Sequence, residues 1–139
     1  MSRVIAVESL GHERNRLSRQ VVLAVRELMK QTEPDLRSKD LTSFIARALI
    51  DIHDTIDPSV TAWERKGYWV KADRFRLEWE WSYAYGEKLR KALLEEDWAT
   101  IAATGVQIAQ KLKNVRVPVR NRLGTPWEGA WAQLQVDQK

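Results

Sequence analysis

The chain has 139 residues, a net charge of +4, an apolar fraction of 44% and a charged fraction of 30%, as an ordinary globular protein does. It contains no cysteine, which excludes disulfides, thiolate metal sites and cysteine nucleophiles and fits a reducing cytoplasm. Two histidines are too few for a histidine-rich metal site, and no apolar run approaches the roughly 20 residues needed to cross a bilayer. We therefore expect one cytoplasmic domain, residues 1–139, without a cofactor, a metal or a membrane segment.

Two amphipathic helices are predicted in the first part of the chain. The first covers residues 12–31, because apolar residues between Leu17 and Leu28 recur at three- and four-residue spacing. The second covers residues 39–56, with Ser38 as its N-cap. The opposite side of the first helix carries a basic stripe: Arg16, Arg19, Arg26 and Lys30.

A long third helix is predicted over residues 58–94, because Asp57-Pro58 is a helix start signal and no strong break follows. The sequence leaves open whether this helix is interrupted at Gly67, since glycine is costly inside a helix. The segment FRLEWEWSYAY, residues 75–85, alternates apolar and polar residues as a strand does. Arg74 and Arg76 stand four residues before Glu78 and Glu80, as they would pair on a helix, and the segment has no evident partner strand, so we predict a helix.

The aromatic residues of this third helix fall on more than one of its faces. Such a helix is either central in its bundle or shared with another chain. We therefore expect the third helix to be the core element and a second chain to complete the fold.

The last third of the chain is predicted to hold two further helices. A fourth helix covers residues 97–113, and an extended connector covers residues 114–124. A short helix follows over residues 126–135, opened by a capping box in the segment 125–128 with proline at its first helical position. The expected fold class is all-α: a four-helix up-and-down bundle with a long central third helix and a short C-terminal helix.

Four tryptophans are the first candidates for contacts with a partner. They are Trp79, Trp81, Trp127 and Trp131. Tryptophan is enriched at protein interfaces, so they could contact a second copy of the chain or another protein. The competing interpretation, which we favour for Trp127 and Trp131, is that these side chains dock onto the bundle.

A second functional hypothesis is nucleic-acid binding. The basic stripe of the first helix and the basic segment 111–122 could follow a phosphate backbone, and such binding would weaken steeply with salt. The candidates in the segment are Lys111, Lys113, Arg116, Arg120 and Arg122. A solvated basic surface is the interpretation we favour.

A third hypothesis comes from the spacing Arg47-x₅-His53, which resembles the arginine–histidine spacing of HEPN-type ribonucleases. The resemblance implies a helical dimer in which His53 acts on the 2′-hydroxyl or leaving group and Arg47 holds the phosphate. The alternative is that Arg47 pairs with Asp51 at four-residue spacing on a solvated face. We favour a non-enzymatic protein that associates with itself or with another protein.

Overall fold

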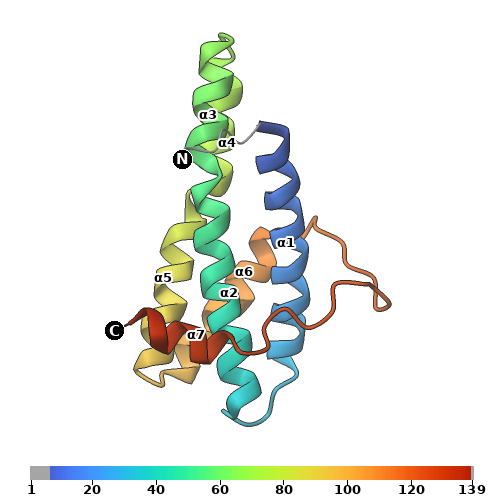
Figure 1. The fold of residues 1–139 in the computed structure, drawn as a ribbon, viewed down its shortest axis with the longest axis vertical. Coiled ribbons are helices and arrows are strands. Elements are labelled where there is room, and N and C mark those ends of the chain that lie inside the picture. Colours follow the sequence, from blue (N-terminus) through green and yellow to red (C-terminus); the bar gives the residue numbers. More distant parts are fainter. Residues whose placement is uncertain (1–6, 139) are drawn as a thin grey trace.

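A computed structural model describes residues 7–138 of this protein, and every regular element in that range is an α-helix, which confirms the all-α prediction. The helices are α1 (Val7–Met29), α2 (Leu36–Asp54), α3 (Ile56–Arg65), α4 (Trp69–Trp79), α5 (Trp81–Leu94), α6 (Trp98–Lys111) and α7 (Ala130–Asp137). Helices α1, α2, α5 and α6 gather in a bundle, α7 crosses α2 and α5, and α3 and α4 project from one end (Figure 1). No helix within residues 7–138 combines the length and apolar character that spanning a bilayer requires.

The central helix is α2, and the prediction that the third helix forms the core is wrong. α2 contacts α1, α5 and α7, and Leu41, Ile45 and Leu49 on it are completely buried. The small side chains of Ala46 and Ala48 are also buried, so α2 is covered on almost all sides.

The long helix predicted over residues 58–94 is three helices, α3, α4 and α5. Gly67 ends the first of them with a φ of +82°, a conformation that glycine adopts without steric cost. The amide of Tyr68 donates to the carbonyl of Trp63 at 2.9 Å and closes the turn that reverses the chain into α4. A second interruption at Glu80 separates α4 from α5.

Gly86, the other glycine of this region, lies inside α5 and does not break it. A Cβ atom there would lie 2.9 Å from Ile50 Cδ1 and 3.0 Å from the carbonyl oxygen of Ala46. The missing side chain therefore lets α5 pack closely against α2.

Three predicted helix starts differ from those observed by three residues or more, and the first is that of α1, which begins at Val7 and not at residue 12. α2 begins at Leu36 because Asp35, not Ser38, is its N-cap: the Asp35 carboxylate accepts from the Ser38 amide at 2.9 Å. The capping box predicted at residues 125–128 does not form, and α7 begins at Ala130 without a local side-chain cap. Instead, two backbone amides at the start of α7 donate to the Asp40 carboxylate of α2: that of Trp131 at 2.9 Å and that of the N-cap residue Gly129 at 3.4 Å.

The connector 114–124 contains no helix and no strand, as expected. It runs beside α1 (Figure 1), where Arg26 Nη2 donates to the carbonyl of Val117 and the Val117 side chain is buried. These contacts fix the connector on the bundle and lead the chain to α7.

Candidate interaction surface on the projecting hairpin

The hairpin formed by α3 and α4 has a small hydrophobic core of its own. Ile56, Val60 and Ala72 are buried there, and half-buried aromatic side chains pack against them. The rings of Trp63 and Phe75 meet edge to face, with centroids 4.7 Å apart. The hairpin therefore projects from the bundle with an interior that joins its two helices.

Arg14 of α1 connects the hairpin to the bundle. Its guanidinium lies 4.5 Å from the centroid of the Phe75 ring and donates to Thr55 Oγ1 at 3.0 Å. Burial lowers the pKa of Arg14, and the negative charge of Glu78 opposes that shift. On the far side of α4, Arg76 pairs with Glu64 of α3 at 3.8 Å.

Helix α4 has apolar residues on two faces, and only one of them is covered. The inward face carries Ala72, Phe75 and Trp79, which pack in the hairpin. The outward face carries Val70 and Leu77, seven residues apart and therefore on one stripe; they are 66% and 67% exposed. Trp69, the first residue of the helix, is exposed too and lies about 100° around the helix from Val70. Within residues 7–138, no part of the chain covers this apolar surface.

The charges on the exposed part of α4 are divided along its length. Lys71 and Arg74 lie in the first half, and Glu78 and Glu80 lie at the end, all with exposed side chains. Within residues 7–138 no ion pair joins any of these four, whereas Asp73 and Arg76 pair with each other at 3.3 Å. The helix therefore presents a basic half and an acidic end around the Val70–Leu77 stripe.

The four tryptophans singled out from the sequence pack within the chain. Trp81 and Trp127 are buried, at 9% and 4% exposure, and Trp79 and Trp131 are half-buried. Lys39 lies over the ring of Trp131. The exposed tryptophan is Trp69, which we did not predict as a contact. The sequence KGYWVK, residues 66–71, could have indicated that Trp69 is exposed, because aromatic residues follow a glycine there and lysines flank them.

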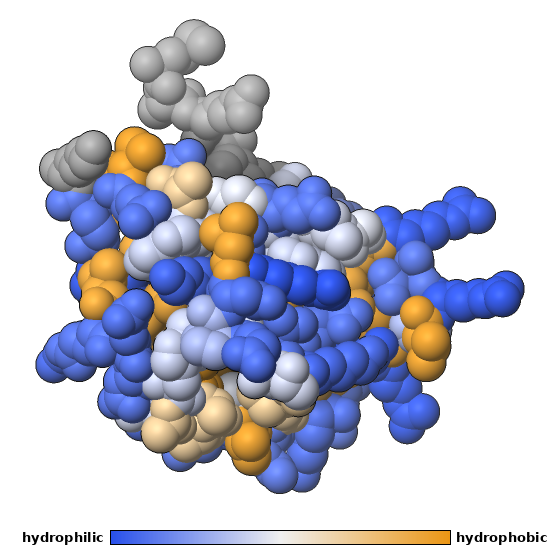
Figure 2. Space-filling view, turned by 90° about the horizontal axis from the view of Figure 1, so that it is seen from below, coloured by the Kyte–Doolittle hydropathy of each residue, from blue (hydrophilic) through white to orange (hydrophobic). Residues whose placement is uncertain are grey.

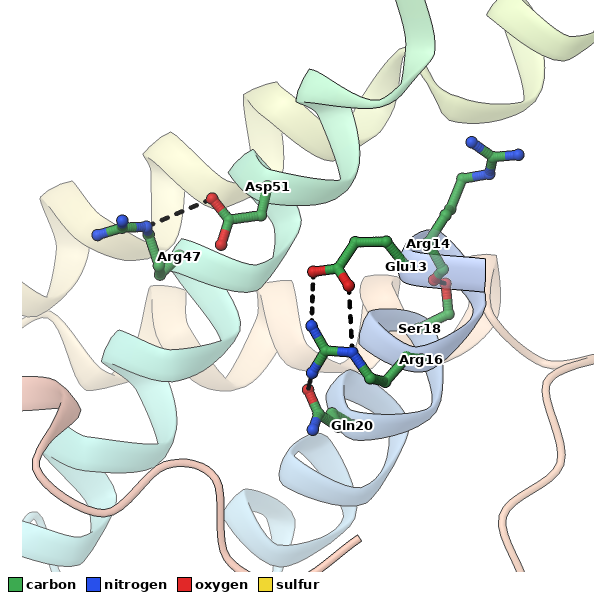
Figure 3. A network of polar contacts seen from close by, with 7 residues as sticks. All are labelled: Glu13, Arg14, Arg16, Ser18, Gln20, Arg47 and Asp51. Atoms are coloured by element: carbon green, nitrogen blue, oxygen red, sulfur yellow. Dashed lines mark hydrogen bonds and ion pairs between the residues drawn. The ribbon is translucent and has the colours of Figure 1, made fainter. Parts of the chain in front are cut away.

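The basic stripe predicted on α1 is largely occupied by contacts inside the protein. Arg16 pairs with Glu13 and also donates to Gln20 (Figure 3). Lys30 pairs with Glu27 at 3.5 Å, and Arg26 holds the connector. Arg19 is exposed and makes no ion pair with another described residue. These contacts reduce the positive charge that the stripe offers to a polyanion.

The five basic residues of segment 111–122 differ from those of the stripe on α1 in that they make no ion pairs with other described residues. The side chains of Lys111, Lys113, Arg116, Arg120 and Arg122 are all exposed. None of the five takes part in an ion pair within the described part of the chain. The segment thus presents its positive charge to solvent.

Arg47 and His53 lie on α2, but no contact joins them. Six residues of α-helix turn two side chains about 120° apart. Arg47 pairs with Asp51 at 3.4 Å (Figure 3) and with Asp137 of α7 at 3.1 Å, whereas the ring of His53 lies 5.2 Å from that of Tyr83. The ribonuclease hypothesis stays a prediction, since a partner chain could complete such a site.

The surface at the end of the bundle away from the hairpin is mostly hydrophilic. Hydrophilic side chains cover most of it, and the hydrophobic ones are scattered between them (Figure 2). Isolated apolar residues of this kind are normal on a monomeric protein, whereas large contiguous apolar patches mark contact surfaces.

The residues from 7 to 138 contain no cluster of three or more histidine or acidic side chains placed to hold a metal ion. Comparisons of the chain with protein-family models, with curated proteins and with solved structures give no match.

Proposed function

We propose that this protein is a non-enzymatic cytoplasmic interaction module that forms a homodimer through the outward face of α4. The observation that carries the proposal is the pair Val70 and Leu77, each about two-thirds exposed on one stripe of a helix that already buries its other face. Trp69, which is also exposed, begins the same helix about 100° around it from Val70.

The charge pattern of α4 favours a second copy as the occupant of this face. In a two-fold symmetric dimer the same surface meets itself. If two α4 helices pack antiparallel, the basic half of each, with Lys71 and Arg74, lies beside the acidic end of the other, with Glu78 and Glu80. A parallel arrangement would place like charges together, so the charge pattern of α4 favours the antiparallel one.

The expected association is weak. Fully burying a valine or leucine side chain contributes about 1.5–3 kcal/mol, and an exposed ion pair contributes about 0.2–1 kcal/mol. Two copies of Val70 and Leu77 are opposed by an association cost of about 4–15 kcal/mol. We therefore expect a dissociation constant no tighter than the micromolar range, and the measurement must extend to about 100 µM protein.

The first experiment is sedimentation equilibrium of the whole chain over that concentration range. We expect a monomer–dimer equilibrium that Leu77→Lys abolishes. The matched control is Val119→Lys in the connector, where the valine is 94% exposed and outside the proposed interface; it should dimerise like the wild type. A wild-type chain that stays monomeric at 100 µM would overturn the proposal.

Charge reversal tests the antiparallel arrangement itself. One variant carries Lys71→Glu and Arg74→Glu, and the other carries Glu78→Lys and Glu80→Lys. Each alone gives the unpaired charges of α4 a single sign, since Asp73 and Arg76 neutralise each other, so its homodimer should be lost. The two mixed should form a heterodimer, because each then meets an oppositely charged helix. Two variants that still form homodimers, or a mixture that stays monomeric, would exclude this interface.

A second candidate function is nucleic-acid binding, which the five exposed cations of segment 111–122 favour. We expect any affinity for single-stranded RNA, measured by fluorescence anisotropy, to fall steeply with salt. Replacing Arg116, Arg120 and Arg122 with alanine should then lower the slope of log K against log salt by about 2. Replacing Lys88 and Lys91, exposed cations of α5, is the control and should leave the slope unchanged. Equal effects of the two variants would exclude this segment as the binding surface.

A further inference from the structure

A cavity of about 440 Å³ lies where α7 crosses α2 and α5. This volume falls in the range of about 300–1,000 Å³ that is typical of small-molecule sites. Its lining residues extend along α2 from Ser43 to Asp54, a distance of about 16 Å at 1.5 Å per residue. The cavity is therefore elongated, and it lies apart from the α4 surface proposed above for dimerisation.

The wall of the cavity is apolar. Phe44 and Ile50 come from α2, and Leu134 comes from α7. Gly86 of α5 adds no side chain, and Ala130 adds only a methyl group at the start of α7. A hydrocarbon chain or ring would thus replace water against this wall without leaving protein polar groups unpaired.

The rim of the cavity has an excess of negative charge. Both lining arginines are already neutralised, Arg47 by Asp51 and Asp137, and Arg90 by Glu87 at 2.7 Å. Asp54 also lines the cavity, is exposed, and has no ion pair or side-chain hydrogen bond within residues 7–138. The rim therefore offers an unneutralised carboxylate, but no arginine without an acidic partner.

A polar group at the other end of the cavity is also unpartnered. Ser43 lines the cavity and is 1% exposed. Among the described residues, its Oγ is the buried side-chain oxygen that makes no hydrogen bond. The adjacent Thr42 satisfies its hydroxyl by donating to the carbonyl of Ser38 at 2.8 Å. A buried hydroxyl without a partner is uncommon in proteins, because an unmade hydrogen bond is costly.

We propose that this cavity binds an amphipathic amine, with its apolar body against Phe44, Ile50 and Leu134 and its ammonium group at Asp54. A carboxylate ligand is disfavoured, because the arginines that would receive it are held by acidic residues of the protein itself.

The experiment compares three probes with the same hydrocarbon tail: n-octylamine, 1-octanol and n-octanoate. Binding to the whole chain at neutral pH is followed by ¹H–¹⁵N NMR. We expect n-octylamine to shift the amides of Ser43, Gly86 and Ala130 and to bind at least about tenfold more tightly than n-octanoate, a difference of about 1.4 kcal/mol. The neutral alcohol should fall between the two.

Two variants separate the charge from the cavity. Asp54→Asn should weaken n-octylamine binding by about fivefold and leave 1-octanol binding unchanged. Asp57→Asn, an exposed carboxylate outside the cavity, is its matched control and should change neither. Ala130→Leu fills the cavity under α7 and should weaken both probes. Octanoate binding as tightly as octylamine, an inert Asp54→Asn, or amide shifts outside the cavity would each overturn the proposal.

Discussion

The guanidinium of Arg14 lies 4.5 Å from the centre of the Phe75 ring, and this contact joins the first helix of the bundle to the second helix of the projecting hairpin. The same group donates to Thr55 Oγ1, at the junction of α2 and α3. One side chain thus contacts both the base of the hairpin and α4. The position of the proposed dimer surface depends on these contacts.

Replacing Arg14 with alanine should loosen the hairpin and leave the bundle folded. A cation–π contact contributes about 0.5–2 kcal/mol, depending on how far it is removed from water. We expect faster amide hydrogen exchange in residues 56–79, with little change in α2 and α5. Arg16→Ala is the control, because Arg16 contacts only neighbours on α1. Unchanged exchange in the hairpin would mean that its own core suffices to hold it.

The sequence predicted those parts of the fold that depend on local periodicity. Three of the predicted helices, at 12–31, 39–56 and 97–113, correspond to α1, α2 and α6, since each has one regular apolar face. The three helices of the region 58–94 were not distinguished from the sequence, because the aromatic residues of this region belong to two separate hydrophobic cores. Trp81 packs in the main core, whereas Phe75 packs in the hairpin, and a single helical pattern cannot represent both.

Contacts between residues distant in the sequence account for most of what was missed. The start of α7 is set by Asp40, which is 91 positions from Trp131, so no local signal could reveal it. The burial of Trp127, in contrast, agrees with the interpretation favoured from the sequence, in which this side chain docks onto the bundle. At Gly67 the chain turns back, so that Ala72 and Phe75 of α4 pack in the hairpin core. Only this packing shows which face of α4 points outward.

Gly86 and Gly105 should respond differently to replacement by alanine. At Gly86 the new methyl group meets the carbonyl of Ala46 at 3.0 Å, a backbone atom that cannot move without shifting α2, so we expect a loss of about 1–3 kcal/mol. At Gly105 it meets Met29 Cε, the end of a flexible and exposed side chain, and alanine is favoured over glycine in a helix by about 1 kcal/mol. Gly105→Ala should therefore leave the free energy of unfolding unchanged or raise it. Urea denaturation measures both, and equal losses would contradict the close approach of α5 to α2.

Replacing Asp40 with alanine should release α7 from the bundle. Asp40 is buried and accepts from two amides in the first turn of α7, which would lose their acceptor. We expect a loss of about 1–3 kcal/mol and faster hydrogen exchange in residues 129–138. Asp57→Ala, on the exposed side of α3, should leave α7 unaffected. Retained protection of α7 would show that the buried ring of Trp127 holds it without Asp40.

The carboxyl group of Asp51 should make the protein slightly less stable at neutral pH than at mildly acidic pH. Burial raises its pKa; Arg47 acts in the opposite direction, and the charges of Asp54 and of Glu13 on α1 add to the rise. Glu13 and Asp51 extend from facing helices in Figure 3. A carboxyl with a raised pKa binds a proton more tightly in the folded state, so its contribution to stability grows as the pH falls through the folded pKa toward the unfolded value of about 3.9.

Asp51→Asn removes this ionisation. We therefore expect a small rise in Tm at pH 7, and a difference from the wild type that shrinks as the pH falls toward 4. Thermal unfolding followed by circular dichroism between pH 4 and 7 measures it, with Asp57→Asn as the exposed control. A variant less stable than the wild type at pH 7 would show that the pair with Arg47, which also links α2 to α7 through Asp137, outweighs the cost of burying the charge.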